Sequence, residues 1–395
     1  MKGDIPHSSL VQLTQAVKAE ARRLGFQLAG VTSPEPPPHF HEFEEWLSAG
    51  RHGAMAYLAS ERSLLRRADP RKILPECRSI LVLGVSYPAS VFPAEPRETF
   101  RGKVAAYAWG RDYHEALTVR LEALAAFIQA QVDFPLPYRC YTDTGPLLER
   151  DLAQRAGLGW IGKNTCLIHP RLGSYFFLAE ILLGVSLELD APFTVDRCGR
   201  CPRCIEACPT GCILPDRTLD ARRCLSYLTI ELKGAIPSEL RPRLGEWVFG
   251  CDICQQVCPW NQRFAPSHAE PAFEAIADRR QPDLVAALAL DGAAFKRSFK
   301  GSPVERARRR GYLRNAAVAL GNLASGSGEP SAVQALANAL KNDPEPLVRR
   351  HAAWALGRVG GWLALEALRQ ALAVETDAET RSEILEALHP LEGIA

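Results

Sequence analysis

Cys198-Gly-Arg-Cys201-Pro-Arg-Cys204-Ile-Glu-Ala-Cys208-Pro209 is the segment of this chain with the most specific residue spacing. It follows the C-x2-C-x2-C-x3-C-P pattern by which bacterial ferredoxins hold iron–sulfur clusters. The later segment Cys251-Asp-Ile-Cys254-Gln-Gln-Val-Cys258-Pro259 repeats the last three cysteines of that pattern. Cys224, which stands alone between the two segments, can replace the missing cysteine. The chain therefore offers eight thiolates, the number that two four-iron clusters need.

The spacing also predicts which cysteines share a cluster, because the fourth cysteine of such a run ligates the other cluster. The ligands expected for cluster one are Cys198, Cys201, Cys204 and Cys258. The ligands expected for cluster two are Cys208, Cys224, Cys251 and Cys254. Structural zinc, which also uses paired CxxC units, explains neither the overlapping third CxxC nor the two CxxxCP endings. Disulfides are less expected than either, because nothing marks the chain as exported.

Length and composition place the chain among ordinary globular proteins. Its 395 residues are 47% hydrophobic and 23% charged with a net charge of +2, which fits two or three domains. The first ten residues lack a basic segment followed by an apolar one, so we expect no signal peptide. The most apolar stretch, Tyr175 to Leu187, contains Glu180 and is too short to span a bilayer. These features predict a soluble, cytoplasmic protein.

The sequence predicts four consecutive segments. Residues 1–190 alternate helical and strand patterns, which favours an α/β or α+β layer domain. Residues 191–265 form the ferredoxin-like double-cluster insert, and residues 266–310 form a basic linker. Residues 311–395 are expected to be HEAT-like helical repeats. The expected strands are 26–31, 80–87 and 138–142, and the expected helices are 10–24 and 115–131.

An internal repeat supports the last of these segments. Arg314-Asn-Ala-Ala-Val-Ala-Leu-Gly321 recurs as Arg350-His-Ala-Ala-Trp-Ala-Leu-Gly357 after 36 residues, with a weaker copy at 381–388. Helix pairs of this period are typical of short solenoids. A plain helical cap that only packs against the rest of the protein remains an alternative.

A basic stretch precedes the repeats. Between Lys296 and Arg314 there are eight Lys or Arg residues and one acid, with Phe295, Phe299 and Tyr312 interleaved. Basic side chains attract phosphates and aromatic rings can stack on unpaired bases, so a nucleic acid is a candidate partner. The alternative is a solvated helix face, as in most charged runs.

Several segments together resemble the epoxyqueuosine reductase family. They are Tyr107-Ala-Trp-Gly-Arg-Asp-Tyr-His114, Thr142-Asp-Thr-Gly-Pro146, Gly157-Leu-Gly-Trp-Ile-Gly-Lys-Asn-Thr165, Gly173-Ser-Tyr-Phe-Phe177, Cys224-Leu-Ser-Tyr-Leu-Thr-Ile-Glu231, the cysteine set and the C-terminal repeats. The resemblance implies removal of the epoxide oxygen of epoxyqueuosine, as water, at the wobble position of tRNA. It further implies two [4Fe-4S] clusters and cobalamin against the N-terminal domain, with one cluster near the corrin and the other near the surface. A soluble electron donor such as ferredoxin or flavodoxin and a monomeric enzyme are expected with it.

The resemblance makes Asp143 the expected proton donor. A carboxylic acid can protonate the alkoxide left by epoxide opening, and burial against the corrin would raise the pKa of Asp143 for this task. The residues alone favour a different role, because Asp143 and Thr144 precede Pro146 and a predicted helix from Leu147 to Ala156, where they would cap the helix.

Other site residues rest on weaker matches, and each could be an ordinary turn or surface residue. The expected cobalamin contacts, besides Asp143, are Arg66, Lys163, Asn164, Ser174, Ser226 and Tyr227. The expected tRNA contacts are Lys233, Arg308, Arg309, Arg310 and Arg314. Cys212 is left spare by ligand counting. The competing functions are a reductive dehalogenase-like cobalamin enzyme and a non-catalytic iron–sulfur electron-transfer protein.

Overall fold

The computed structural model describes residues 7–89, 91, 100–266, 270–276 and 278–392. Its contacts form two compact units that are interleaved along the chain. Unit 1 comprises Met1–Ala89, Gly110–Arg222 and Ile253–Glu274. Unit 2 comprises Ser90–Trp109, Arg223–Asp252 and Ala275–Ala395. The four consecutive segments expected from the sequence differ from these units, and their boundaries stay a prediction.

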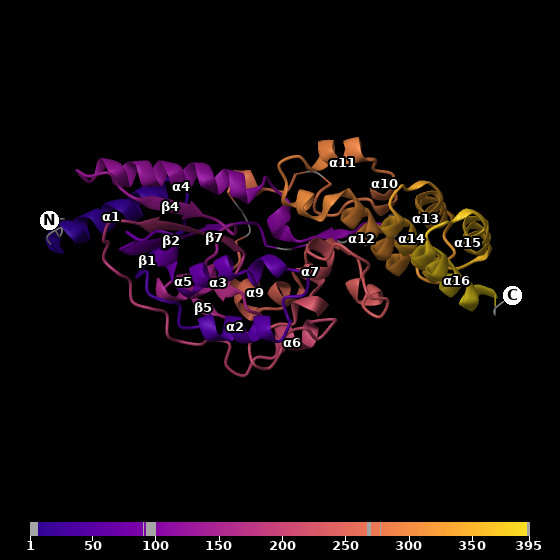
Figure 1. Cartoon of the computed structure of the whole chain (residues 1–395), viewed down its shortest axis with the longest axis horizontal. Helices are drawn as coiled ribbons and strands as arrows, with labels where there is room; N and C mark the ends of the chain where they lie inside the picture. Colours follow the sequence, from indigo (N-terminus) through magenta and orange to yellow (C-terminus); the bar gives the residue numbers. More distant parts are fainter. Residues whose placement is uncertain (1–6, 90, 92–99, 267–269, 277, 393–395) are drawn as a thin grey trace. The chain divides into compact units, whose positions relative to one another are not determined.

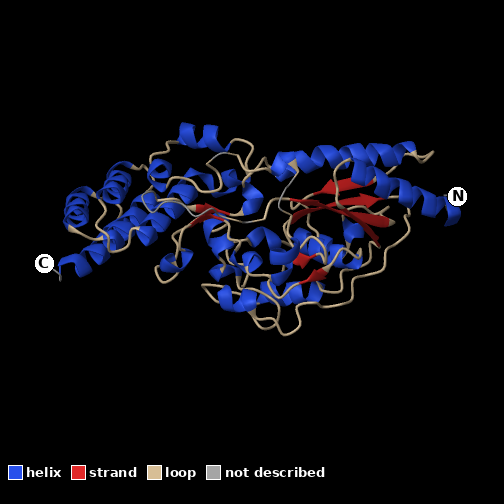
Figure 2. Ribbon diagram, turned by 180° about the vertical axis from the view of Figure 1, so that it is seen from behind, coloured by secondary structure: helices blue, strands red, loops and turns tan. Residues whose placement is uncertain are grey.

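Unit 1 is built on a four-stranded antiparallel sheet in the order β1-β2-β7-β4. These strands are β1 (Leu28–Thr32), β2 (Ser79–Ser86), β7 (Phe176–Leu183) and β4 (Tyr138–Tyr141). Every residue of β2 is buried, as its continuous apolar sequence requires. Helices cover the sheet on both faces, α1 and α4 on one and α3 and α5 on the other (Figures 1 and 2). The antiparallel pairing makes the layer domain α+β.

The expected elements of this sheet are confirmed with small shifts at their ends. The helix expected at 10–24 is α1 (His7–Arg23), and the one expected at 115–131 is α4 (Tyr113–Ala130). The remaining elements of unit 1 are α2 (Phe40–Ser48), η1 (Ala56–Leu58), α3 (Glu61–Ala68), η2 (Pro70–Lys72), α5 (Glu149–Arg155), the hairpin of β5 (Trp160–Ile161) and β6 (Leu167–Ile168), α6 (Arg203–Ala207), α8 (Ile253–Gln256), α9 (Pro259–Phe264) and η6 (Pro271–Phe273). The turn η4 (Ala221–Arg223) lies where the chain passes from unit 1 to unit 2.

Unit 2 contains a short parallel pair and the C-terminal helices. Strand β3 (Lys103–Val104) pairs with β8 (Trp247–Phe249). The helices are η3 (Ala106–Ala108), α7 (Leu225–Ile230), η5 (Arg241–Leu244), α10 (Leu284–Leu288), α11 (Gly292–Phe299), η7 (Pro303–Ala307), α12 (Arg308–Leu323), α13 (Pro330–Asn342), α14 (Pro346–Val359), α15 (Trp362–Val374) and α16 (Ala378–Glu392).

The internal repeat is a stack of helices, as expected. Its three copies lie on α12, α14 and α16. A Cβ atom at Gly321 would lie 2.7 Å from the Cβ of Ala355, and one at Gly357 would lie 2.9 Å from that of Ala387. The repeated glycine therefore lets successive helices approach closely. In the part of the chain that the structure describes, no helix is both long and apolar enough to cross a membrane.

Candidate functional site

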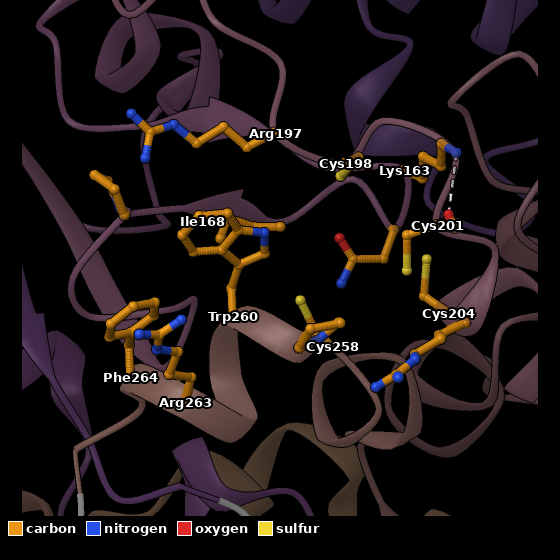
Figure 3. Close-up of a pocket in the computed structure, with 14 residues that line it drawn as sticks. Lys163, Ile168, Arg197, Cys198, Cys201, Cys204, Cys258, Trp260, Arg263 and Phe264 are labelled. Atoms are coloured by element: carbon orange, nitrogen blue, oxygen red, sulfur yellow. Dashed lines mark hydrogen bonds between the residues drawn. The ribbon is translucent and has the colours of Figure 1, made fainter.

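The four cysteines expected to hold cluster one line a single pocket of unit 1. This pocket has a volume of about 510 Å³ and contains the side chains of Cys198, Cys201, Cys204 and Cys258 (Figure 3). Cys204 lies on α6, and Cys258 caps α9, which begins with a proline. All four cysteines are free of disulfide bonds. Cysteines that are far apart in the sequence are thus brought together around one pocket.

Polar groups of unit 1 hold the loop that carries these cysteines. The indole Nε1 of Trp160 donates to the sulfur of Cys198 at 3.4 Å. The ammonium of Lys163 donates to the carbonyl oxygens of Gly199 and Cys201 at 2.7 and 3.0 Å. Hydrogen bonds to cluster sulfurs and ligand backbones orient thiolates and tune the potential of a bound cluster.

Four thiols can hold a single zinc ion or an iron–sulfur cluster, and the two require different spacing of the sulfurs. Among the described residues, no three Cys, His, Asp or Glu side chains converge tightly enough to hold one metal ion. A single zinc needs its sulfur ligands about 2.3 Å from one point. In a four-iron cluster, each thiolate instead binds a separate iron.

The ligands expected for cluster two are distributed between the units. Cys208 and Cys254 belong to unit 1, and Cys224 and Cys251 belong to unit 2, so this ligand set stays a prediction. The spare Cys212 is buried, with its sulfur 3.4 Å from that of Cys208. This hydrogen bond is the largest influence that lowers the pKa of the Cys208 thiol, to about 4.

Asp143 lies at the edge of a second hollow of unit 1, with a volume of about 480 Å³. It follows β4 in the loop before α5 and has a φ of +57°, which is strained for a residue other than glycine. Its N–H donates to Oε1 of Glu149 at 2.8 Å. Helix α5 begins at Glu149 and its cap residue is Leu148, which makes no side-chain hydrogen bond. The helix-capping interpretation of Asp143 is therefore wrong.

Two aromatic side chains at the start of α4 face the Asp143 carboxylate. The hydroxyl of Tyr113 donates to Oδ2 of Asp143 at 2.7 Å, and Nε2 of His114 lies 3.8 Å from the same oxygen. Nδ1 of His114 lies 2.7 Å from Asp112. Burial lowers the pKa of His114, but its hydrogen bond with Asp112 and its interaction with Asp143 outweigh burial and raise that pKa to about 9.

The raised pKa expected for Asp143 depends on burial against the corrin and stays a prediction. The interaction with His114, 3.8 Å away, lowers the pKa of Asp143, burial opposes this, and the hydrogen bond from the Tyr113 hydroxyl lowers the pKa further. The Asp143 side chain is 66% exposed and lines the hollow. At neutral pH the proton of this group therefore rests on His114, and Asp143 is a carboxylate.

Two further carboxyl groups lie behind Asp143. Glu180 is fully buried in the middle of β7, and its register partner on β4 is Tyr141. Burial, followed by repulsion from Glu149 and Asp143, raises the pKa of Glu180 well above its usual range. Burial and then the charge of Asp143 raise the pKa of Glu149 to about 8. The pKa values of both groups are thus raised beside Asp143.

Comparison with known proteins identifies the family. A family model described as epoxyqueuosine reductase QueG, DUF1730, matches residues 67–144. The epoxyqueuosine reductase of Pseudomonas aeruginosa is 41% identical over 353 residues, which cover 88% of this chain and 95% of the relative. This chain belongs to the epoxyqueuosine reductase family. The corresponding enzyme of Xanthomonas campestris is 43% identical over 348 residues, covering 87% of this chain and 95% of that protein.

Solved structures and further family models extend this result to the whole fold. A crystal structure of an epoxyqueuosine reductase with an epoxyqueuosine-modified tRNA-Tyr stem loop matches with a TM-score of 0.89 at 32% identity, covering 96% of this chain and 99% of that one. A 4Fe-4S double cluster binding domain matches residues 197–261, and HEAT repeats match residues 306–389. The chain is therefore a reductase of this family with two [4Fe-4S] clusters and HEAT repeats.

The residues expected to contact cobalamin lie in different surroundings of the structure, and their contacts stay predictions. Lys163 and Asn164 line the cysteine pocket, not the hollow beside Asp143. Arg67 lines that hollow, whereas the expected Arg66 does not. Ser174 is buried, and its hydroxyl donates to Gln255 and accepts from Asn261. These polar groups of Ser174 are thus used inside unit 1.

The other two expected contacts belong to unit 2. Ser226 and Tyr227 lie in the first turn of α7, which Cys224 caps. Tyr227 is buried and Ser226 is half-buried. Their predicted contact with cobalamin stays a prediction.

One expected tRNA contact is wrong. Arg314 is fully buried, and its guanidinium donates to the carbonyl oxygens of Leu228, Leu232 and Gly234. It therefore holds the chain after α7 and is closed to a phosphate. The prediction that these aromatic rings stack on unpaired bases is also wrong, because Phe295, Phe299 and Tyr312 are buried against one another.

The remaining basic residues differ in whether other groups of the protein already bind them. Arg309 pairs with Asp343 at 2.5 Å, and Arg310 lies 4.0 Å from Glu345. The ammonium of Lys233 donates to two carbonyl oxygens, those of Ile230 and Arg306. Arg308 is exposed at the first turn of α12.

Sequence reasoning missed several residues of these sites. Tyr113 and His114 were inside the segment that carried the resemblance, and the adjacency of Asp, Tyr and His could have indicated an acid–base group. Glu149 gave no such signal, because nothing in a lone glutamate at the start of a helix indicates a raised pKa.

Proposed function

We propose that this chain reduces epoxyqueuosine to queuosine in tRNA, removing the epoxide oxygen as water with two electrons and two protons. The observation that carries the proposal is the 41% identity to an epoxyqueuosine reductase over 88% of this chain. A solved relative that was crystallised with an epoxyqueuosine-modified stem loop, of TM-score 0.89, supports the tRNA substrate. The dehalogenase and the non-catalytic alternatives have no comparable support.

The hollow beside Asp143 suits part of a large ring cofactor such as cobalamin. Phe43, Trp46 and Tyr57 supply apolar wall, and Arg67 supplies a positive charge. Oδ1 of Asp151, which also lines the hollow, is buried and has no hydrogen-bond partner among the described residues. An apolar wall with a few polar groups is typical of cofactor sites. When bound, cobalamin would supply a cobalt centre reduced enough to cleave the C–O bond, while the protein supplies position and protons.

The protein's own part in the reaction is proton delivery. Asp143 faces the hollow from a strained loop, and His114 holds a proton 3.8 Å from it. We infer that the proton passes from His114 to Asp143, and from Asp143 to the oxygen that leaves the opened epoxide. The hydroxyl of Tyr113 keeps the Asp143 carboxylate in position through its 2.7 Å hydrogen bond. A Bacillus subtilis relative of TM-score 0.87 is described as having its catalytic aspartate loop swung out of the active site, which supports a mobile acid in this family.

The deciding experiment is anaerobic turnover of epoxyqueuosine-containing tRNA with chemical reductant, with and without cobalamin. Nucleosides from the digested tRNA would be identified by mass, and we expect cobalamin-dependent loss of one oxygen. Asp143→Asn should lower the rate about 100-fold or more, because general acid catalysis contributes at least this much. Asp133→Asn, at an exposed position of the same unit, serves as the matched control. If no conversion occurs although both clusters are intact and cobalamin is bound, epoxyqueuosine-containing tRNA is not the substrate.

Several features of the working enzyme are part of the same proposal. We take it to be a monomer, which leaves room for a whole tRNA. We place the reaction in the cytoplasm, where thiols stay available for iron–sulfur clusters. Electrons reach the clusters from a soluble carrier, and no motif of the sequence identifies that carrier.

A further inference from the structure

The cysteine pocket of unit 1 extends beyond its thiols. Figure 3 shows Cys201, Cys204 and Cys258 at one end of the pocket and Arg197, Arg263 and Phe264 at the other, with Trp260 between them. Trp260 follows the ligand Cys258 by two residues, and its ring contacts that of Phe264 at 5.7 Å between centroids. The pocket therefore connects the site of cluster one with a rim of basic and aromatic side chains.

The rim is strongly positive. Lys163, Arg197, Arg203 and Arg263 line the pocket, and none of its lining residues, all of them described, is acidic. The three arginines are exposed. Of the acids nearest in sequence, Asp196 pairs with Arg217 at 2.5 Å, while Glu206 is exposed on α6. The charge that a partner meets over cluster one is therefore positive.

Neighbouring aromatic and amide groups hold these arginine side chains in place without neutralising their positive charge. The guanidinium of Arg197 lies over the rings of Phe193 and Trp260 at 5.6 and 5.7 Å, and that of Arg263 lies over Phe264 at 5.1 Å. Arg203 donates to the neutral side chain of Gln262. Because cation–π contacts and amide hydrogen bonds leave the positive charge uncompensated, the rim keeps its attraction for an anionic surface.

We propose that this rim, formed by Arg197, Arg203 and Arg263, is the docking surface for a small acidic protein that carries one electron at a time. The proposal rests on the proposed function, because each turnover consumes two electrons. Two reduced carriers would dock in succession, and each would be oxidised by one electron while cluster one is reduced by one. Such complexes are small and transient, and opposite charges speed their formation.

The test follows cluster reduction alone, without tRNA or cobalamin. Reduced flavodoxin would be mixed anaerobically with the cluster-loaded protein, and bleaching of cluster absorbance would be timed over a series of salt concentrations. We expect the second-order rate constant of the unmodified protein to fall steeply with salt. The double variant Arg197→Glu/Arg263→Glu should be about 10- to 100-fold slower at low salt and nearly insensitive to salt.

Controls separate docking from damage and from the substrate assignment. Arg22→Glu/Arg139→Glu makes the same charge change at exposed positions of unit 1 and should retain the unmodified rate. Photoreduced deazaflavin, a small reductant, should reduce all variants equally, and Arg197→Lys should keep most of the carrier rate. An unmodified carrier rate in the rim double variant, or equal losses in the control double variant, would overturn the proposal. Because no tRNA is present, failure of this test leaves the substrate assignment untouched, and failure of turnover leaves this result standing.

Discussion

His114 lies between two carboxylates, 2.7 Å from Asp112 and 3.8 Å from Asp143. Its pKa of about 9 means that it is an imidazolium at neutral pH, which makes it the proton reserve of the Asp143 site. An acid that must be protonated loses its function as pH rises through its pKa. Activity of the unmodified enzyme should therefore fall above about pH 9.

His114→Gln tests this role. The variant removes the proton reserve and also the interaction that most lowers the pKa of Asp143. We expect turnover about 10- to 100-fold slower than that of the unmodified enzyme. The fall at high pH should also move to lower pH, because Asp143 then titrates alone. Single-turnover rates measured from pH 6 to 10 would decide, and an unchanged basic limb would contradict the relay.

Glu149 predicts a pH dependence of stability. Its folded pKa of about 8 exceeds the ordinary 4.5, so the folded state holds a proton that the unfolded state releases between these values. Its contribution to stability is complete below pH 4.5 and is lost as pH rises to about 8, with a slope of at most about 1.4 kcal/mol per pH unit. Glu149→Gln should flatten this slope in thermal unfolding, whereas Glu115→Gln, at an exposed position of α4, should not. Parallel curves for the unmodified protein and Glu149→Gln would count against the raised pKa.

For single residues, the sequence was informative where the spacing of residues along the chain determines their chemistry. The cysteines of cluster one were predicted because a ferredoxin pattern fixes which thiols meet. The interaction of Asp143 with His114 was not predicted, because His114 is 29 positions earlier and the contact depends on the path of a loop. Arg314 was mistaken for a phosphate contact because composition cannot reveal that three carbonyl oxygens surround its guanidinium.

At the scale of the elements, the close packing of successive repeat helices depends on a glycine at each contact. A Cβ at Gly357 would lie 2.9 Å from Cβ and 3.1 Å from Cα of Ala387. Close backbone approach of this kind cannot be relieved by turning a flexible side chain. The 36-residue period therefore carries a packing requirement as well as a helical pattern.

Gly357→Ala should destabilise the contact between α14 and α16. The added methyl group overpacks the interface, which costs about 1–3 kcal/mol, against a helix-propensity gain of about 1 kcal/mol. Hydrogen exchange followed by mass spectrometry should show faster exchange in these two helices. Gly292→Ala in α11, where a Cβ meets nothing within 4 Å, should leave exchange unchanged or slower. Equal exchange in the two variants would show that the close contact is not required.

For the whole molecule, local periodicity predicted the elements better than their grouping. The strand expected at 80–87 became β2 because a continuous apolar run suits a strand buried on both faces. The interleaving of the two units was not predictable, since a short strand such as β3 joins unit 2 through a partner far along the chain. Composition indicates which segments fold, and only long-range contacts decide which of them pack together.

Of the properties of the whole molecule, tRNA binding depends most on its charged side chains. Within α12, Arg309 and Arg310 are engaged by Asp343 and Glu345, but Arg308 is exposed. The start of a helix is already electropositive, so an exposed arginine there strengthens the attraction for a phosphate. Because each phosphate contact releases about one counterion, Arg308→Ala should weaken tRNA binding and reduce the slope of log K against log salt by about 1.

Two further variants make this prediction specific. Arg358→Ala removes an exposed arginine from the last turn of α14, a position that we did not predict to contact tRNA, and should leave the slope unchanged. Arg314→Gln removes a buried structural guanidinium, so it should lower the unfolding temperature while the salt slope of the folded fraction is retained. Filter binding of unmodified tRNA over a salt series would measure all three variants. If Arg308→Ala keeps the full slope while Arg314→Gln reduces it, the phosphate contact does not lie where we predict it.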